Sequence, residues 1–154
     1  MDEAGNIGVL YFLPDEPVYR KISAYVKKLQ DKGKRVKALG YVESKHLTGQ
    51  FLPKLSYDFF FPSGLSWNYK PTSTAVREFI DSEFDILIDL STKNSLPLLF
   101  ITGLSRAKFK VGMQRDDSAA YLDMMISLQE KDGLEELITQ IDHYISIINK
   151  KDEI

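Results

Sequence analysis

Residues Phe84–Gly112, FDILIDLSTKNSLPLLFITGLSRAKFKVG, contain the pattern that decides the fold. Phe84–Leu90 is an almost continuous apolar run, which is typical of a strand covered on both faces. A turn rich in hydroxyl and amide side chains follows, then an apolar helix at Asn94–Ser105 and a second strand at Ala107–Met113. Pro97 fits this helix because it falls in the first turn. The stretch therefore predicts one strand-helix-strand unit of a parallel sheet, with its turn where such sheets bind ligands.

The same alternation of strand and helix patterns continues in both directions along the chain. Further strands are predicted at Ile7–Leu13, Arg35–Val42, Tyr57–Phe61 and Tyr121–Leu128. Further helices are predicted from Pro17 to a stop at Gly33, from a cap at Thr72 or Ser73 to Ile80, and from Asp132 to Lys151. In the last helix, Leu137, Ile138, Ile141 and Ile145 form an apolar stripe that should face the sheet.

This alternation predicts the α/β class, with a three-layer, mostly parallel sheet of five or six strands and helices on both faces. We expect the Rossmann-like strand order 3-2-1-4-5 with the sixth strand at the edge, and the flavodoxin-like order is the alternative. The 154 residues fit one domain, which we expect to span residues 1–154.

Composition excludes several classes of function. The net charge of −2 gives no basic face for nucleic acid, and no run approaches the length of a membrane span. The chain has no cysteine, which excludes disulfides, thiolate catalysis and cysteine-based zinc sites. We expect a cytoplasmic protein, although the natural chain could extend beyond this N-terminus.

Polar side chains follow the first and fourth predicted strands, where the expected strand order reverses. Asp15 follows the first strand, and Ser91, Thr92, Lys93 and Asn94 follow the fourth. Ligands of open parallel sheets bind at this reversal, so these five residues form a candidate ligand site. Helix capping by Asp15 and Asn94 explains the same residues without a ligand.

Asp89 lies near the end of a buried strand, where a carboxylate needs hydrogen bonds. Bonding to loop amides is the preferred interpretation, and a general base with a raised pKa is the alternative. His46 follows the second strand, but no partner is spaced for a metal site or a Ser-His-Asp arrangement.

An aromatic loop follows the third strand. Trp67 and Tyr69 stand among polar residues there, so they could stack on a sugar or form a protein interface. Coverage of the sheet edge by the loop itself explains them equally well.

Residues Phe84–Gly112 also resemble the N-terminal domain of the heptosyltransferases that build lipopolysaccharide cores, a family of two-domain glycosyltransferases. Those proteins carry an aromatic-Asp pair, an apolar run and Asp-Leu, followed by a helix ending near Gly and a basic strand closing on Gly. The matching residues are Phe84, Asp85, Ile86, Ile88, Asp89, Leu90, Ser95, Leu99, Gly103, Arg106, Lys110, Val111 and Gly112.

This chain departs from the heptosyltransferase pattern, because it has Ser91-Thr92-Lys93 where the family places a Gly after Asp-Leu. It also ends before the second domain, which in the family holds the sugar nucleotide. The whole chain is similar to a family of small bacterial proteins with no assigned function. Neither resemblance assigns a catalytic residue.

Two functional interpretations follow. The first is a non-enzymatic binding or interaction domain on a glycosyltransferase-like scaffold, with a small polar or anionic ligand or a protein as partner. The second is a small enzyme, or half of a split transferase, acting on a nucleotide-linked or phosphorylated sugar. The sequence has no catalytic pattern and no GxGxxG or Walker motif, so we expect no cofactor and prefer the first interpretation. It predicts no oligomeric state.

Overall fold

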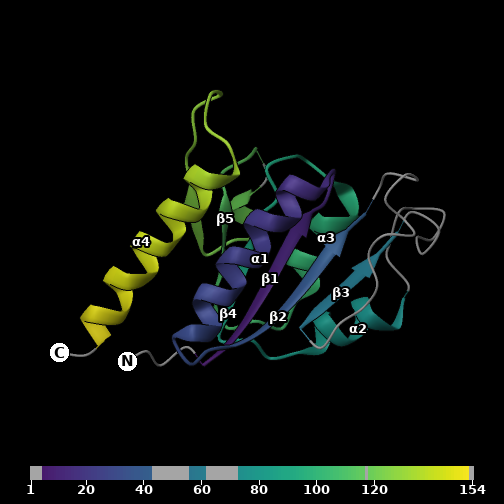
Figure 1. The fold of residues 1–154 in the computed structure, drawn as a ribbon, viewed down its shortest axis with the longest axis horizontal. Helices are drawn as coiled ribbons and strands as arrows, with labels where there is room; N and C mark the ends of the chain where they lie inside the picture. The colour runs from purple at the N-terminus through teal and green to yellow at the C-terminus, as the bar shows by residue number, and fades with distance from the viewer. Residues whose placement is uncertain (1–4, 43–55, 62–72, 117, 153–154) are drawn as a thin grey trace.

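A computed structural model describes residues 5–42, 56–61, 73–116 and 118–152, and the side chains among them up to residue 147 (Figure 1). It contains a six-stranded, all-parallel sheet in the order β3-β2-β1-β4-β5-β6. The strands are β1 (Asn6–Phe12), β2 (Arg35–Tyr41), β3 (Tyr57–Phe60), β4 (Ile86–Asp89), β5 (Lys110–Met113) and β6 (Met124–Ile126). The Rossmann-like prediction is confirmed, with the sixth strand at the edge, and the flavodoxin-like alternative is wrong.

Helices cover both faces of this sheet (Figure 1). On one face, α1 (Glu16–Asp31) and α4 (Leu134–Asp152) pack with the alternate strand residues that include Val9 and Ile88. On the other face, α2 (Thr74–Asp81) and α3 (Leu96–Leu104) pack with Leu10 and Leu87. The three-layer prediction is therefore confirmed.

Strand β4 lies inside the sheet, between β1 and β5. Ile86, Leu87 and Ile88 are all buried, as the apolar run predicted, because helices cover both sides of the strand.

The aromatic-Asp pair before β4 fixes the start of β1. A Cβ on Gly8 would lie 2.6 Å from the Phe84 ring, so the missing side chain makes room for that ring. The Asp85 carboxylate accepts hydrogen bonds from the backbone N–H groups of Gly5 and Asn6, both at 3.0 Å. These bonds hold the pKa of Asp85 below its usual value, with the Asn6 bond as the largest cause.

Local hydrogen bonds correct the predicted start of the sixth strand. A 3-10 turn at Ser118–Ala120 continues as the N–H groups of Tyr121 and Leu122 donate back to the Ser118 carbonyl. Residues 121–123 are therefore not part of β6, which is shorter than the predicted strand Tyr121–Leu128.

The connection from β5 to β6 has consequences for the molecular surface. Its described residues contain this 3-10 turn and no α-helix, although helices make the other described crossovers. On the α3 side, β5 is consequently packed against this turn, through Leu122, and not against a helix of the connection. Within the described part of the chain, no helix has the length and apolarity to cross a membrane.

Candidate functional site

A cavity of about 310 Å³ opens where β4 and β5 end, beside the first turns of α3. Its polar lining comes from the end of β4, the loop before α3, α3 itself and the loop after β5, while leucines form the rest. The lining residues are Asp89, Asn94, Ser95, Leu96, Leu99, Thr102, Arg115, Asp116, Ser118, Tyr121 and Leu122.

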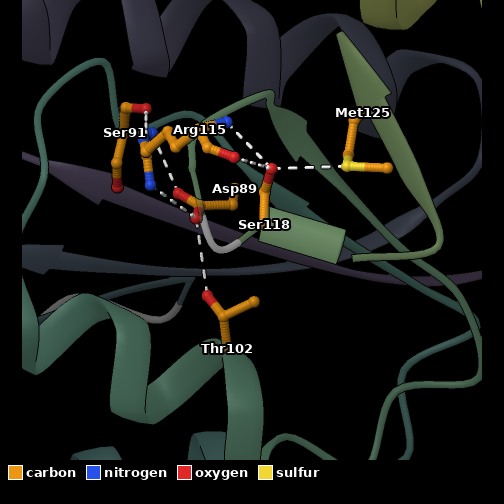
Figure 2. A network of polar contacts seen from close by, with 6 residues as sticks. All are labelled: Asp89, Ser91, Thr102, Arg115, Ser118 and Met125. Carbon is orange, nitrogen blue, oxygen red and sulfur yellow. Dashed lines mark hydrogen bonds and ion pairs between the residues drawn. The ribbon is translucent and has the colours of Figure 1, made fainter. Parts of the chain in front are cut away.

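Asp89 is the last residue of β4, and its side chain is directed to the α3 side of the sheet (Figure 2). One carboxylate oxygen, Oδ1, accepts the Ser91 backbone N–H at 2.9 Å. The other, Oδ2, lies 3.5 Å from the Thr102 hydroxyl, which donates to it. The predicted bonding to the loop is therefore confirmed for one amide, that of Ser91, and Thr102 of α3 supplies the second donor.

Burial raises the pKa of the Asp89 carboxyl, since the charged form loses its contact with water. The nearby Arg115 guanidinium and the hydrogen bonds to Asp89 act in the opposite direction without cancelling this effect. A carboxyl in this environment is a strong acceptor when charged and a donor when protonated.

Arg115 is the cation of the site, and it reaches the cavity from the loop after β5. Its Nη1 lies 4.0 Å from Asp89 Oδ2, and its Nη2 donates to the Ser91 carbonyl oxygen (Figure 2). The buried Nε finds no acceptor among the described residues. Arg115 is thus positioned by two groups on the β4 side, the Asp89 carboxylate and the Ser91 carbonyl.

The turn after β5 holds Arg115 in place through its backbone. The Ser118 hydroxyl accepts the Arg115 N–H at 2.8 Å and donates to the Arg115 carbonyl at 2.7 Å. At the base of the site, a Cβ on Gly112 would lie 3.1 Å from the Asp89 Cβ and 3.2 Å from Leu122 Cδ1. Glycine at this position therefore lets β5 pack closely against both residues.

At the rim of the cavity, the first turn of α3 differs from the prediction that Asn94 caps this helix. Ser95, not Asn94, is the N-cap residue, because Pro97 lies in the first turn and the helix begins at Leu96. The Ser95 side chain makes no capping hydrogen bond, unlike Ser73 of α2 and Asp15 of α1, which accept the N–H of Val76 and Val18. Ser95 and Asn94 both line the cavity, so their polar side chains can reach a ligand.

The five predicted ligand residues do not all meet at this cavity. Asn94 lines it, and Ser91 is buried beside it with its backbone bonded to both Asp89 and Arg115. Thr92 is exposed, and the Lys93 ammonium lies 5.0 Å from the centre of the Phe12 ring. Asp15 caps α1. The prediction that these five residues bind one ligand stays a prediction.

The sequence did not predict Arg115, Asp116, Ser118 and Tyr121 as site residues. The first three lie between the predicted strands Ala107–Met113 and Tyr121–Leu128, and Tyr121 was expected to begin the second of these strands. The available signal was the position of this segment after β5, next to the end of β4. Trp67, Tyr69 and His46, which were also considered, lie outside the described residues. Among the described residues, no three His, Asp or Glu side chains group as a metal site would require.

Comparison with known proteins identifies the family of the chain. A family model described as a family of unknown function, DUF6913, matches residues 1–148. The chain belongs to the DUF6913 family. This agrees with the expected similarity to a family without assigned function, while the bacterial origin and the heptosyltransferase resemblance stay predictions. No match to this DUF6913 chain was found among curated proteins or among solved structures.

Proposed function

We propose that this DUF6913 protein is a non-enzymatic binding domain that holds a small ligand carrying an oxyanion and hydroxyl groups in the cavity between β4 and β5. The observation that carries this proposal is the buried Asp89–Arg115 pair at the cavity wall. The cavity volume of about 310 Å³ lies at the lower end of the usual range for small-molecule sites, roughly 300–1,000 Å³.

The two charged groups suit different parts of such a ligand. The Arg115 guanidinium, which lines the cavity, is a charge-assisted donor for an oxyanion. The Asp89 carboxylate can accept hydrogen bonds from hydroxyl groups of a ligand. Ser91 and Thr102 each donate one hydrogen bond to it, so lone pairs on its oxygens remain available. A ligand with both kinds of group therefore matches the pair better than a bare phosphate.

A purely structural role explains this pair poorly. Burying an ion pair is costly, and well-packed apolar residues often give equal or greater stability. Here the pair stands beside an open cavity, and the rim residues Asn94 and Ser95 make no capping bond with their side chains.

Catalysis at the same cavity is the second candidate, and the raised pKa of Asp89 is the observation that favours it. A buried carboxyl with a raised pKa can serve as a general acid or base. On this account the substrate would be a phosphorylated or nucleotide-linked sugar, and release of free sugar or phosphate from a bound probe would distinguish catalysis from binding.

The test is a thermal-shift screen with glycerol 3-phosphate, sugar phosphates, nucleotides and nucleotide sugars. A ligand that binds only the folded state, present at about 100 times its Kd, stabilises the protein by about 2.7 kcal/mol. We expect at least one phosphorylated polyol to raise the Tm. If none does, the small-ligand proposal is wrong, and a protein partner becomes the better interpretation.

Ser95→Ala and Ser73→Ala form a matched pair for this screen. Ser95→Ala removes no capping bond, so we expect an unchanged Tm without ligand and a loss of affinity of about tenfold, equivalent to one hydrogen bond to a charged group. Ser73→Ala removes the cap of α2 and should cost about 1 kcal/mol of stability while leaving affinity unchanged. Equal affinities of the two variants would place the ligand elsewhere.

A further inference from the structure

The side of α3 that faces away from the sheet is apolar. Leu96, Leu99, Phe100, Gly103 and Leu104 follow the spacing of one helical face, and we call them the α3 stripe. Leu96 and Leu104 are 49% and 48% exposed. Thr102 carries the only polar side chain of α3, and it is buried against Asp89. The usual arrangement of a surface helix is therefore reversed.

A second hollow, of about 260 Å³, lies along the α3 stripe and is closed on one side by Tyr121. Leu96, Leu99 and Tyr121 also line the polar cavity, so the two hollows adjoin. One molecule can therefore occupy both, with its polar part beside Arg115 and its apolar part along α3.

Gly103 shapes the far part of this hollow. A Cβ at this position would lie 2.9 Å from Tyr121 Cδ1, so glycine lets the aromatic ring approach the helix backbone. Glycine weakens a helix relative to alanine, and this close approach gives a reason for its presence. The ring and the leucines together line this hollow, which we call the apolar groove.

We infer that the ligand of this site is a single-chain amphiphile: its head carries the oxyanion and hydroxyl groups, and its aliphatic chain lies along the α3 stripe. The inference rests on the proposed function, because it places the head in the same cavity. A wholly polar ligand would leave the stripe in water, and a wholly apolar one would cover the Asp89–Arg115 pair without offering it a polar group. The occupant is one dissolved molecule, since the groove adjoins a charged pair that lies below the surface, at the wall of a cavity too small for a bilayer surface to enter.

The test is calorimetric titration with glycerol 3-phosphate and its 1-acyl esters from butanoyl to decanoyl, each kept below its self-association concentration. Each methylene buried should raise affinity about fourfold, until the chain extends past Leu104. If glycerol 3-phosphate binds and chain length has no effect, the amphiphile inference fails while the proposed function stands. If neither the head alone nor any ester binds, the amphiphile inference is contradicted, and the proposed function is contradicted as well only if the thermal-shift screen is also negative.

Leu104→Gln and Ile147→Gln are matched variants, because both residues are exposed and Ile147 belongs to α4 on the opposite face of the sheet. We expect Leu104→Gln to weaken binding of the decanoyl ester at least tenfold without changing the affinity for glycerol 3-phosphate. Ile147→Gln should change neither affinity. Equal effects of the two variants would overturn the inference. A lower sedimentation coefficient for Leu104→Gln alone would also overturn it, by showing that a second copy of the chain covers the stripe.

Discussion

Asp89 connects the core of the sheet to the candidate site. It ends a strand whose other residues are apolar, and its carboxylate is buried between Ser91, Thr102 and Arg115. Its raised pKa means that the folded protein binds the Asp89 proton more tightly than the unfolded chain does. The Asp89 contribution to stability is therefore greatest at low pH and falls as the pH rises from about 3.9, the unfolded value, through the raised folded value.

Asp89→Asn removes this titration and keeps an acceptor for the Ser91 N–H. We expect the free energy of unfolding of the wild type, minus that of the variant, to decrease as the pH rises from about 3.9. Urea titrations of both proteins between pH 3.5 and 8 measure this difference. Parallel pH profiles would show that the folded environment does not perturb Asp89.

The sequence predicted that Asp89 is buried and hydrogen-bonded, but it did not predict that Arg115 lies beside it. The difference has a physical reason. A carboxylate at the end of an apolar strand is recognisable because burial requires hydrogen bonds, and the nearest donors are those of the following turn. Arg115 reaches Asp89 only because the Ser118 hydroxyl bonds both its N–H and its carbonyl and so fixes the loop after β5. No periodicity marks such a turn.

At the scale of elements, α4 shows how an amphipathic pattern determines packing. Leu137 and Ile141 are fully buried, and Ile138 and Ile145 are partly buried against the same core, as the apolar stripe predicted. The apolar sequence of α3 predicted a helix but not its exposed face, because leucines surround it on nearly every side. The described residues between β5 and β6 form no α-helix beside α3, and Leu96 and Leu104 on that face are about half exposed.

Ile141→Ala tests whether α4 is integral to the core. The substitution should lower the free energy of unfolding by roughly 2–5 kcal/mol, through lost transfer energy and the cavity left behind. Denaturant unfolding monitored by circular dichroism measures this change. An unchanged midpoint would show that α4 is peripheral to the cooperative unit.

For the whole molecule, alternating strand and helix patterns predicted the sheet and its three layers, and left two strand orders, of which the preferred one is observed. They predicted a ligand site at the reversal of strand order, between the loops after β1 and β4. That site stays a prediction, and the cavity described above lies on the other side of β4, beside β5. Its place depends on which connection lacks a helix, and short apolar runs such as Tyr121–Leu128 do not reveal that.

The most direct test of the central claim is an amide chemical-shift titration of the ¹⁵N-labelled protein with glycerol 3-phosphate. We predict that the largest shifts occur at residues 94–102 and 115–122, around the cavity between β4 and β5. Residues 15–18, at the start of α1 beyond the other edge of β4, should remain unchanged. Shifts confined to residues 15–18 and 91–93 would contradict the account and place the ligand between β1 and β4.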